Sequence, residues 1–257
     1  MLLAVDVGNT HTVLGLFDGS ELVHDWRVST VVTRTADELA IMVFDLLKLY
    51  GLDRSAVSAF ALASVVPRLN VQYPLMSTRH LKVEPLVVAP GVKTGMPILT
   101  NNPREVGADL IVDGVAAYER YGGPCIVVDF GTATTFSAIS SKGEYLGTAI
   151  APGIEVSIDA LASRAAKLSK IELVDPGTVI GRSTQHSMQA GVVFGFAGQV
   201  DGIIGKMREE LGGHAVSVAT GGLACLVFEH ARTLDHLDSM LTLKGLELIF
   251  RRSQEGR

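Results

Sequence analysis

The sequence predicts an α/β protein made of two similar halves with a cleft between them. The first segment, LLAVDVGNTHTVLGLFDG, shares its plan with a later one, CIVVDFGTATTFSAISSKG. In each, an apolar run breaks at Asp-x-Gly and resumes as a β-branched run that ends at Gly. Helical and strand-like patterns follow both segments. This repeat favours duplicated lobes around a ligand-binding cleft, although unrelated α/β proteins also repeat strands and Asp-Gly turns by coincidence.

The sequence of the first half predicts three strands, followed by a helix and further elements. Asp18-Gly19 marks a tight hairpin, and Thr35 with Glu38 has the spacing of a capping box at a helix start. The expected strands cover 2–7, 12–17, 22–28, 57–65 and 84–88, and the expected helices cover 36–50 and about 67–80.

The second half repeats this order. Its expected strands cover 124–129, 133–139, 144–150 and 215–219, with a turn at Lys142-Gly143 and a long apolar helix near 183–211. A helix from about 103 to 121, opened by Asn102-Pro103, connects the halves. We therefore expect an N-terminal lobe over 1–117 and a C-terminal lobe over 118–257.

Composition narrows the function classes. The chain has 257 residues, 47% of them hydrophobic, and a net charge of −5 with scattered Lys and Arg, which disfavours nucleic acid as a partner. No apolar run approaches the length of about 18 residues needed for a membrane span, and Asp6 interrupts the first one. Cys125 and Cys225 each lie among apolar residues and are expected to be buried free thiols. These features predict a cytoplasmic protein.

The two Asp-x-Gly breaks have the chemistry of phosphate loops. Gly8 permits close backbone approach to a ligand, and Asn9 and Thr10 supply polar side chains. A carboxylate such as Asp6 would repel phosphate unless it holds Mg²⁺, directly or through water. Asp129 begins the same arrangement in the second half. A buried Asp that caps a turn is the commoner explanation for either break alone, whereas the pair favours a nucleotide site.

Two further clusters remain ambiguous from the residues alone. Gly221-Gly222 sits between a strand and an apolar helix, where it fits either a flat adenosine ring or a close-packed turn. Asp109 is spaced one helical turn from both Glu105 and Asp113. That spacing favours a solvated acidic stripe over a functional carboxylate.

Five ordered motifs, DVGNTHTVLG, NNPREVGAD, VVDFGTATTF, GTAIAPGI and MQAGVVFGFAGQVDGII, resemble the type III pantothenate kinase family from Met1 to about Phe250. The resemblance implies an actin-like, sugar-kinase-like fold of two duplicated ribonuclease-H-like lobes. It also implies transfer of the γ-phosphate of ATP to pantothenate, the first step of coenzyme A biosynthesis. The implied cofactors are Mg²⁺ and a monovalent cation, K⁺ or NH₄⁺, and the implied assembly is a homodimer.

The resemblance also assigns roles by position. Asp109 becomes the catalytic base, which reverses the acidic-stripe interpretation, and Asp129 the ligand of the monovalent cation. Asp6 lies near the divalent metal, through phosphate or water. ATP contacts are implied for Asp6, Val7, Gly8, Asn9, Thr10, His11, Thr12, Val13 and Thr132, and pantothenate contacts for Thr100, Gly107, Ala108, Asp109, Leu110 and Thr184.

Two positions depart from the family pattern. Leu110 stands where relatives generally have an Arg that contacts pantothenate, and Thr100 where a Tyr is common. Loss of the Arg removes a fork of donors suited to a carboxylate, for which Lys93, Arg104 or Arg164 could compensate. Two alternatives therefore stay open: a kinase for another small hydroxy acid, and a nucleotide-binding paralogue that has lost turnover and serves a regulatory or partner role.

Overall fold

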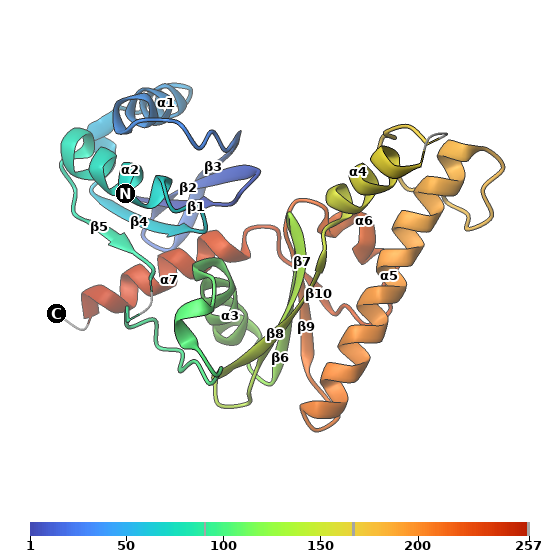
Figure 1. Ribbon diagram of the computed structural model, residues 1–257. Helices are drawn as coiled ribbons and strands as arrows, with labels where there is room; N and C mark the ends of the chain where they lie inside the picture. The colour runs from blue at the N-terminus through green and yellow to red at the C-terminus, as the bar shows by residue number, and fades with distance from the viewer. Residues whose placement is uncertain (90, 166–167, 256–257) are drawn as a thin grey trace. The chain divides into compact units, whose positions relative to one another are not determined.

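A computed structural model describes residues 1–89, 91–165 and 168–255, which form two compact units (Figure 1). The first unit contains Met1–Met96, Asn101–Ala116 and the chain from Leu241, and the second contains Pro97–Thr100 and Ala117–Met240. The expected lobes divided the chain once, between 117 and 118. The structure differs because the last helix returns to the first unit and packs on its sheet.

The first unit is built on a five-stranded mixed sheet in the order β3-β2-β1-β4-β5. Strands β1, β2 and β3 form the predicted antiparallel meander, while β4 and β5 continue the sheet parallel to β1. The bounds are β1 (Leu2–Val7), β2 (His11–Asp18), β3 (Glu21–Ser29), β4 (Ala59–Ser64) and β5 (Pro85–Val87).

The second unit repeats the same sheet, in the order β8-β7-β6-β9-β10. Here β6, β7 and β8 form the meander, and β9 and β10 run parallel to β6. The bounds are β6 (Cys125–Phe130), β7 (Ala133–Ile139), β8 (Tyr145–Pro152), β9 (Val216–Thr220) and β10 (His236–Leu237). Strand order and direction agree in the two sheets, which confirms the predicted repeat.

Helices cover these sheets: α1 (Ala36–Lys48), α2 (Leu69–Met76), α3 (Ala108–Tyr121), α4 (Ile154–Arg164), α5 (Thr184–Glu210), α6 (Ala224–Phe228) and α7 (Leu241–Glu255). The capping box of α1 is confirmed, since the Thr35 side chain accepts from the Glu38 amide at 3.3 Å and Glu38 accepts from the Thr35 amide at 2.8 Å. Not one of the helices in the described ranges has the length and apolar character needed to cross a bilayer.

The connecting helix begins later than the sequence predicts. Pro103–Glu105 forms a separate 3₁₀ turn capped by Asn102, and α3 starts only at Ala108. The backbone of Val106 is extended between them, with φ −73° and ψ 124°. This break places Asp109 in the first turn of α3 instead of in the middle of a longer helix.

Each unit has its own apolar core. In the first, alternate residues of β1 and β2, such as Leu3, Val5 and Leu14, belong to one buried cluster with α1 and α2. In the second, Ile126 and Val128 of β6 cluster with apolar residues of α4 and α5. The apolar runs that predicted these strands are therefore buried in the two cores.

The two cysteines are both free, but they differ in exposure. Cys125 is buried in β6, and burial raises the pKa of its thiol to about 12. Cys225 is exposed, so the expectation that both thiols are buried is wrong for this residue. Its helix, α6, buries Ala224 and Val227 instead, and Cys225 lies on the exposed side of the helix.

Candidate active site

The first predicted phosphate loop connects β1 to β2 in the first unit. The Gly8 amide donates to the carbonyl oxygen of His11 at 3.0 Å, which closes the loop tightly. A Cβ at Gly8 would lie 3.0 Å from that same oxygen. Asn9, Thr10 and His11 are exposed around this bend, so their side chains and amides are in a position to meet a phosphate.

The other predicted residues of this loop are less exposed. Asp6, Gly8 and Val13 are half-buried, and Val7 is fully buried in the core, which leaves only its backbone for a ligand. Thr12 is 2% exposed, and its hydroxyl lies 2.9 Å from that of Thr30. The Thr12 hydroxyl therefore faces the protein interior.

The second predicted loop connects β6 to β7 in the second unit and closes in a similar way. The Gly131 amide donates to the carbonyl oxygen of Ala133 at 3.0 Å. Asp129 is half-buried at the end of β6, where it is paired with Thr135 on one side and Thr220 on the other. Thr132 is exposed at the tip of the loop. Both halves thus present a carboxylate at the end of their central strand.

Glycines from distant segments allow the second loop to pack closely. Gly221 has a φ of +94°, and a Cβ there would overlap Oδ1 of Asp129 and lie 2.7 Å from the amide nitrogen of Phe130. A Cβ at Gly153 would overlap the carbonyl oxygen of Thr132. Gly221 is therefore packed closely against Asp129.

Asp109 lies in the first turn of α3, in the first unit. Its Oδ1 accepts the backbone amide of Leu110 at 2.9 Å. A Cβ at Gly107 would overlap that same Oδ1, so only glycine leaves room for this carboxylate. Burial raises the pKa of Asp109, and the backbone hydrogen bonds lower it by a smaller amount. A carboxylate with a raised pKa is better suited to accept a proton.

The acidic stripe expected around Asp109 is not formed. Glu105 lies outside α3, in the exposed 3₁₀ turn, and Asp113 is only 2% exposed. Helix α7 covers this part of α3 so closely that a Cβ at Gly245 would overlap the carbonyl oxygen of Val112. The expectation of a solvated stripe is wrong because one neighbouring carboxylate lies outside the helix and the other is buried.

The predicted pantothenate contacts are divided between the units. Gly107, Ala108, Asp109 and Leu110 are half-buried in the first. Thr100 belongs to the second, and within the described residues its buried hydroxyl has no hydrogen-bond partner. Thr184 is exposed at the start of α5. It borders a hollow of about 310 Å³ whose lining is Ser169, Lys170, Ile171, Glu172, Thr184, Gln185 and Met188.

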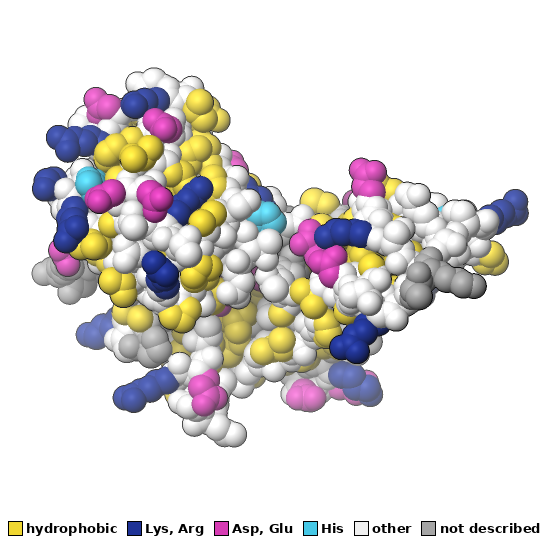
Figure 2. All heavy atoms as spheres, turned by 45° about the horizontal axis from the view of Figure 1, so that its top comes forward, with side chains coloured by type: hydrophobic (Ala, Val, Ile, Leu, Met, Phe, Trp, Pro, Cys, Tyr) yellow, Lys and Arg dark blue, Asp and Glu magenta, His cyan; other side chains and the backbone are white. Residues whose placement is uncertain are grey.

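The charges that could replace the missing Arg are all on the surface. Lys93, Arg104 and Arg164 are exposed. Arg104 lies in the 3₁₀ turn that precedes α3, five positions before Asp109 in sequence and in the same unit. Figure 2 shows Lys and Arg interspersed with Asp and Glu across the face drawn.

The two carboxylates expected near cations, Asp6 and Asp129, are both half-buried near the end of a strand. In the part of the chain that the structure describes, no three His, Cys, Asp or Glu side chains gather to hold a metal ion. Hard cations take oxygen ligands from phosphate, water and backbone carbonyls as readily as from carboxylates. A divalent ion at Asp6 would therefore complete its coordination with phosphate and water.

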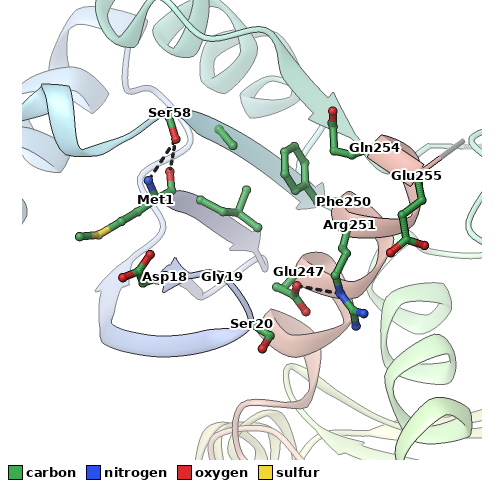
Figure 3. A pocket seen from close by; sticks show the side chains of 12 residues that line it. Met1, Asp18, Gly19, Ser20, Ser58, Glu247, Phe250, Arg251, Gln254 and Glu255 are labelled. Carbon is green, nitrogen blue, oxygen red and sulfur yellow. Dashed lines mark hydrogen bonds and ion pairs between the residues drawn. The ribbon is translucent and has the colours of Figure 1, made fainter. Parts of the chain in front are cut away.

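Another hollow, of about 540 Å³, lies in the first unit away from these residues (Figure 3). It is lined by Met1 and Leu2, at the amino end of β1, whereas the phosphate loop follows the carboxyl end. Glu247 and Arg251 of α7 form an ion pair of 3.2 Å on its wall. This hollow includes none of the predicted site residues.

Comparisons with known proteins identify the family. The family model described as Type III pantothenate kinase matches residues 2–206. The type III pantothenate kinase of Moorella thermoacetica is 56% identical over 253 residues, which cover 98% of this chain and 100% of that protein. The enzyme of the same name from Myxococcus xanthus is 53% identical, with coverages of 98% and 99%.

Solved structures with low sequence identity share the fold. The activator of 2-hydroxyisocaproyl-CoA dehydratase from Clostridium difficile superposes with a TM-score of 0.56 at 12% identity, covering 100% of this chain and 97% of that one. The inorganic polyphosphate/ATP-glucomannokinase of an Arthrobacter strain gives 0.53 at 15%, with coverages of 100% and 99%. The predicted actin-like α/β fold is confirmed, and the chain belongs to the type III pantothenate kinase family.

Proposed function

We propose that this chain transfers the γ-phosphoryl group of ATP to the primary hydroxyl of pantothenate, the first step of coenzyme A biosynthesis. The hydroxyl oxygen forms the new bond to phosphorus, the bond from the γ-phosphorus to the bridging oxygen breaks, and ADP leaves. The observation that carries this proposal is full-length similarity to type III pantothenate kinases at 56% and 53% identity. The half-buried carboxylate of Asp109 supports it.

In this proposal Asp109 is the catalytic base. Phosphoryl transfer has a loose transition state, so the carboxylate mainly orients the attacking hydroxyl and accepts its proton late. The Leu110 amide fixes Oδ1 by a hydrogen bond of 2.9 Å. The proposed pantothenate contacts are Gly107, Ala108 and Leu110 in the first unit and Thr100 and Thr184 in the second.

The two loops bind ATP and its cations. The phosphates are bound by the backbone of Val7, Gly8 and Val13 and by the exposed residues Asn9, Thr10 and His11. The buried Thr12 supports the loop from the protein interior. Asp6 faces the Mg²⁺ site through phosphate or water, and bound Mg²⁺ offsets charge on the phosphates. In the second loop, Asp129 binds K⁺ or NH₄⁺ and Thr132 contacts ATP.

Gly221→Ala is expected to abolish stimulation by K⁺. The added methyl would overlap Oδ1 of Asp129 at a φ of +94°, so the carboxylate must move from its place. Wild-type protein should work faster in K⁺ than in Na⁺, and the variant should give equal, low rates in both. Gly222→Ala, at the exposed neighbouring glycine, is the control. Normal K⁺ stimulation in Gly221→Ala would contradict the role of Asp129.

A homodimer through α5 is part of the proposal. Gly191, Gly195, Gly198 and Gly202 recur at helical spacing on α5, and a Cβ at each would meet nothing within 4 Å. Such a row lets a second helix approach closely. In the same unit, Val179 is 65% exposed and Ile180 is 83% exposed.

A cytoplasmic location is also proposed, because both cysteines are free.

An ADP-release assay tests the function. Purified protein is mixed with ATP, Mg²⁺ and K⁺, with pantothenate present, absent or replaced by other hydroxy acids. We expect ADP release that depends on pantothenate. Leu110 favours two alternatives, a kinase for another small hydroxy acid and a regulatory paralogue without turnover, and the assay distinguishes them. Preference for another alcohol would indicate the different kinase. ATP binding without stimulated ADP release would indicate the regulatory paralogue.

A further inference from the structure

A chain of buried hydroxyl groups leads from α2 to the first phosphate loop. The Tyr73 phenol, 1% exposed, is hydrogen-bonded to the side chain of Thr12. The Thr12 hydroxyl lies 2.9 Å from that of Thr30, which in turn donates to the carbonyl oxygen of Gly8 at 2.8 Å. Side chains from α2, from β2 and from the residue after β3 are thus connected to one backbone atom of the loop.

The direction of the hydrogen bond between Thr12 and Thr30 follows from the last member of the chain. A carbonyl oxygen only accepts, so Thr30 donates its single hydroxyl proton to the carbonyl oxygen of Gly8. Thr30 must then accept from Thr12. Burial raises the pKa of Tyr73 to about 12, so the phenol stays neutral. Aligned donors of this kind strengthen one another.

Thr30 also holds the loop at a second point. Its backbone amide donates to the carbonyl oxygen of Thr10 at 2.9 Å. Residues 8 to 10 are therefore clamped at both ends by one residue that lies just beyond β3. Without that clamp, Gly8 has a wide choice of backbone conformations.

We propose that Thr30 is a positioning residue for ATP binding. Thr30 fixes the first phosphate loop in its binding conformation, and Thr12 and Tyr73 support Thr30 through their hydroxyl groups. The inference rests on the proposed function, because it takes this loop as the phosphate site. Amides that are already aimed at a phosphate lose little freedom when it binds. Thr30 itself need not touch the nucleotide.

Thr30→Val tests this role, because valine has nearly the same shape and lacks the hydroxyl. We expect the KM for ATP to rise about three- to tenfold, the size expected for one lost hydrogen bond. The dissociation constant of a non-hydrolysable ATP analogue, measured by calorimetry, should rise by the same factor. The KM for pantothenate should stay unchanged. Thr30→Ser keeps the hydroxyl and should restore both ATP values.

Two further variants separate positioning from general stability. Thr33→Val makes the same exchange at an exposed threonine three residues away and should leave both ATP values unchanged. Tyr73→Phe removes the far end of the chain and should lower Tm while raising the KM for ATP less than Thr30→Val does. A wild-type ATP affinity in Thr30→Val would overturn the inference. Wild-type protein without pantothenate-dependent ADP release would instead overturn the proposed function.

Discussion

Asp109→Asn is expected to lower turnover by about 10²- to 10⁴-fold, the usual contribution of a general base. Asparagine keeps the shape, and its Oδ1 can still accept the Leu110 amide. It cannot take the proton from the attacking hydroxyl. The affinity for the ATP analogue should stay near the wild-type value, since the base acts on the other substrate. Turnover retained within a few-fold of wild type would contradict the assignment.

The same variant should unfold at a higher temperature than the wild type at neutral pH. Burial raises the pKa of Asp109 above its unfolded value, so the ionised carboxylate costs stability at neutral pH. That cost begins to decrease as pH falls below the folded pKa and is gone below the unfolded pKa, whereas the neutral amide removes it at every pH. The Tm advantage of Asp109→Asn should therefore shrink as the buffer is made more acidic. An inactive variant with a lower Tm would indicate damage to the fold.

Leu110→Arg is expected to lower the KM for pantothenate by about ten- to a hundredfold. A charged hydrogen bond to a substrate carboxylate contributes about 1.5–3 kcal/mol, and a guanidinium offers two donors in a fork. The half-buried Leu110 follows Asp109 directly in α3, so the new side chain starts beside the proposed base. Initial rates over a range of pantothenate concentrations measure the effect.

The matched control is Leu110→Gln, which has a long polar side chain without charge. It should change the pantothenate KM much less than Leu110→Arg. An unchanged KM in Leu110→Arg would mean that the pocket recognises the carboxylate by another residue, for which the exposed Arg104 is the first candidate to replace.

Local signals predicted much of this fold. Continuous apolar runs identified the central strands β1 and β6, and the Asp-x-Gly breaks identified where each strand ends. The Thr35 and Glu38 pair marked the start of α1 correctly. These features depend on neighbours within a few residues, so one stretch of sequence contains them fully.

Features that depend on distant segments could not be predicted in this way. Gly221 lies against Asp129 because β9 pairs with β6, and that pairing joins residues about ninety positions apart. Helix α7 returns to the first unit and contacts α3 at Val112, next to the buried Asp113 that the expected stripe would have exposed. Thr30 was missed for the same reason, since only strand pairing brings it to Gly8. The spacing of residues along the chain contains no sign of these contacts.

Hydrogen–deuterium exchange with the non-hydrolysable ATP analogue, Mg²⁺ and K⁺ tests the central claim most directly. The claim is that the bends after β1 and β6 both serve the nucleotide and its ions. We predict slower exchange in residues 8–12 and in residues 130–133 at the same analogue concentration. Protection of one bend alone, or of neither, would contradict it.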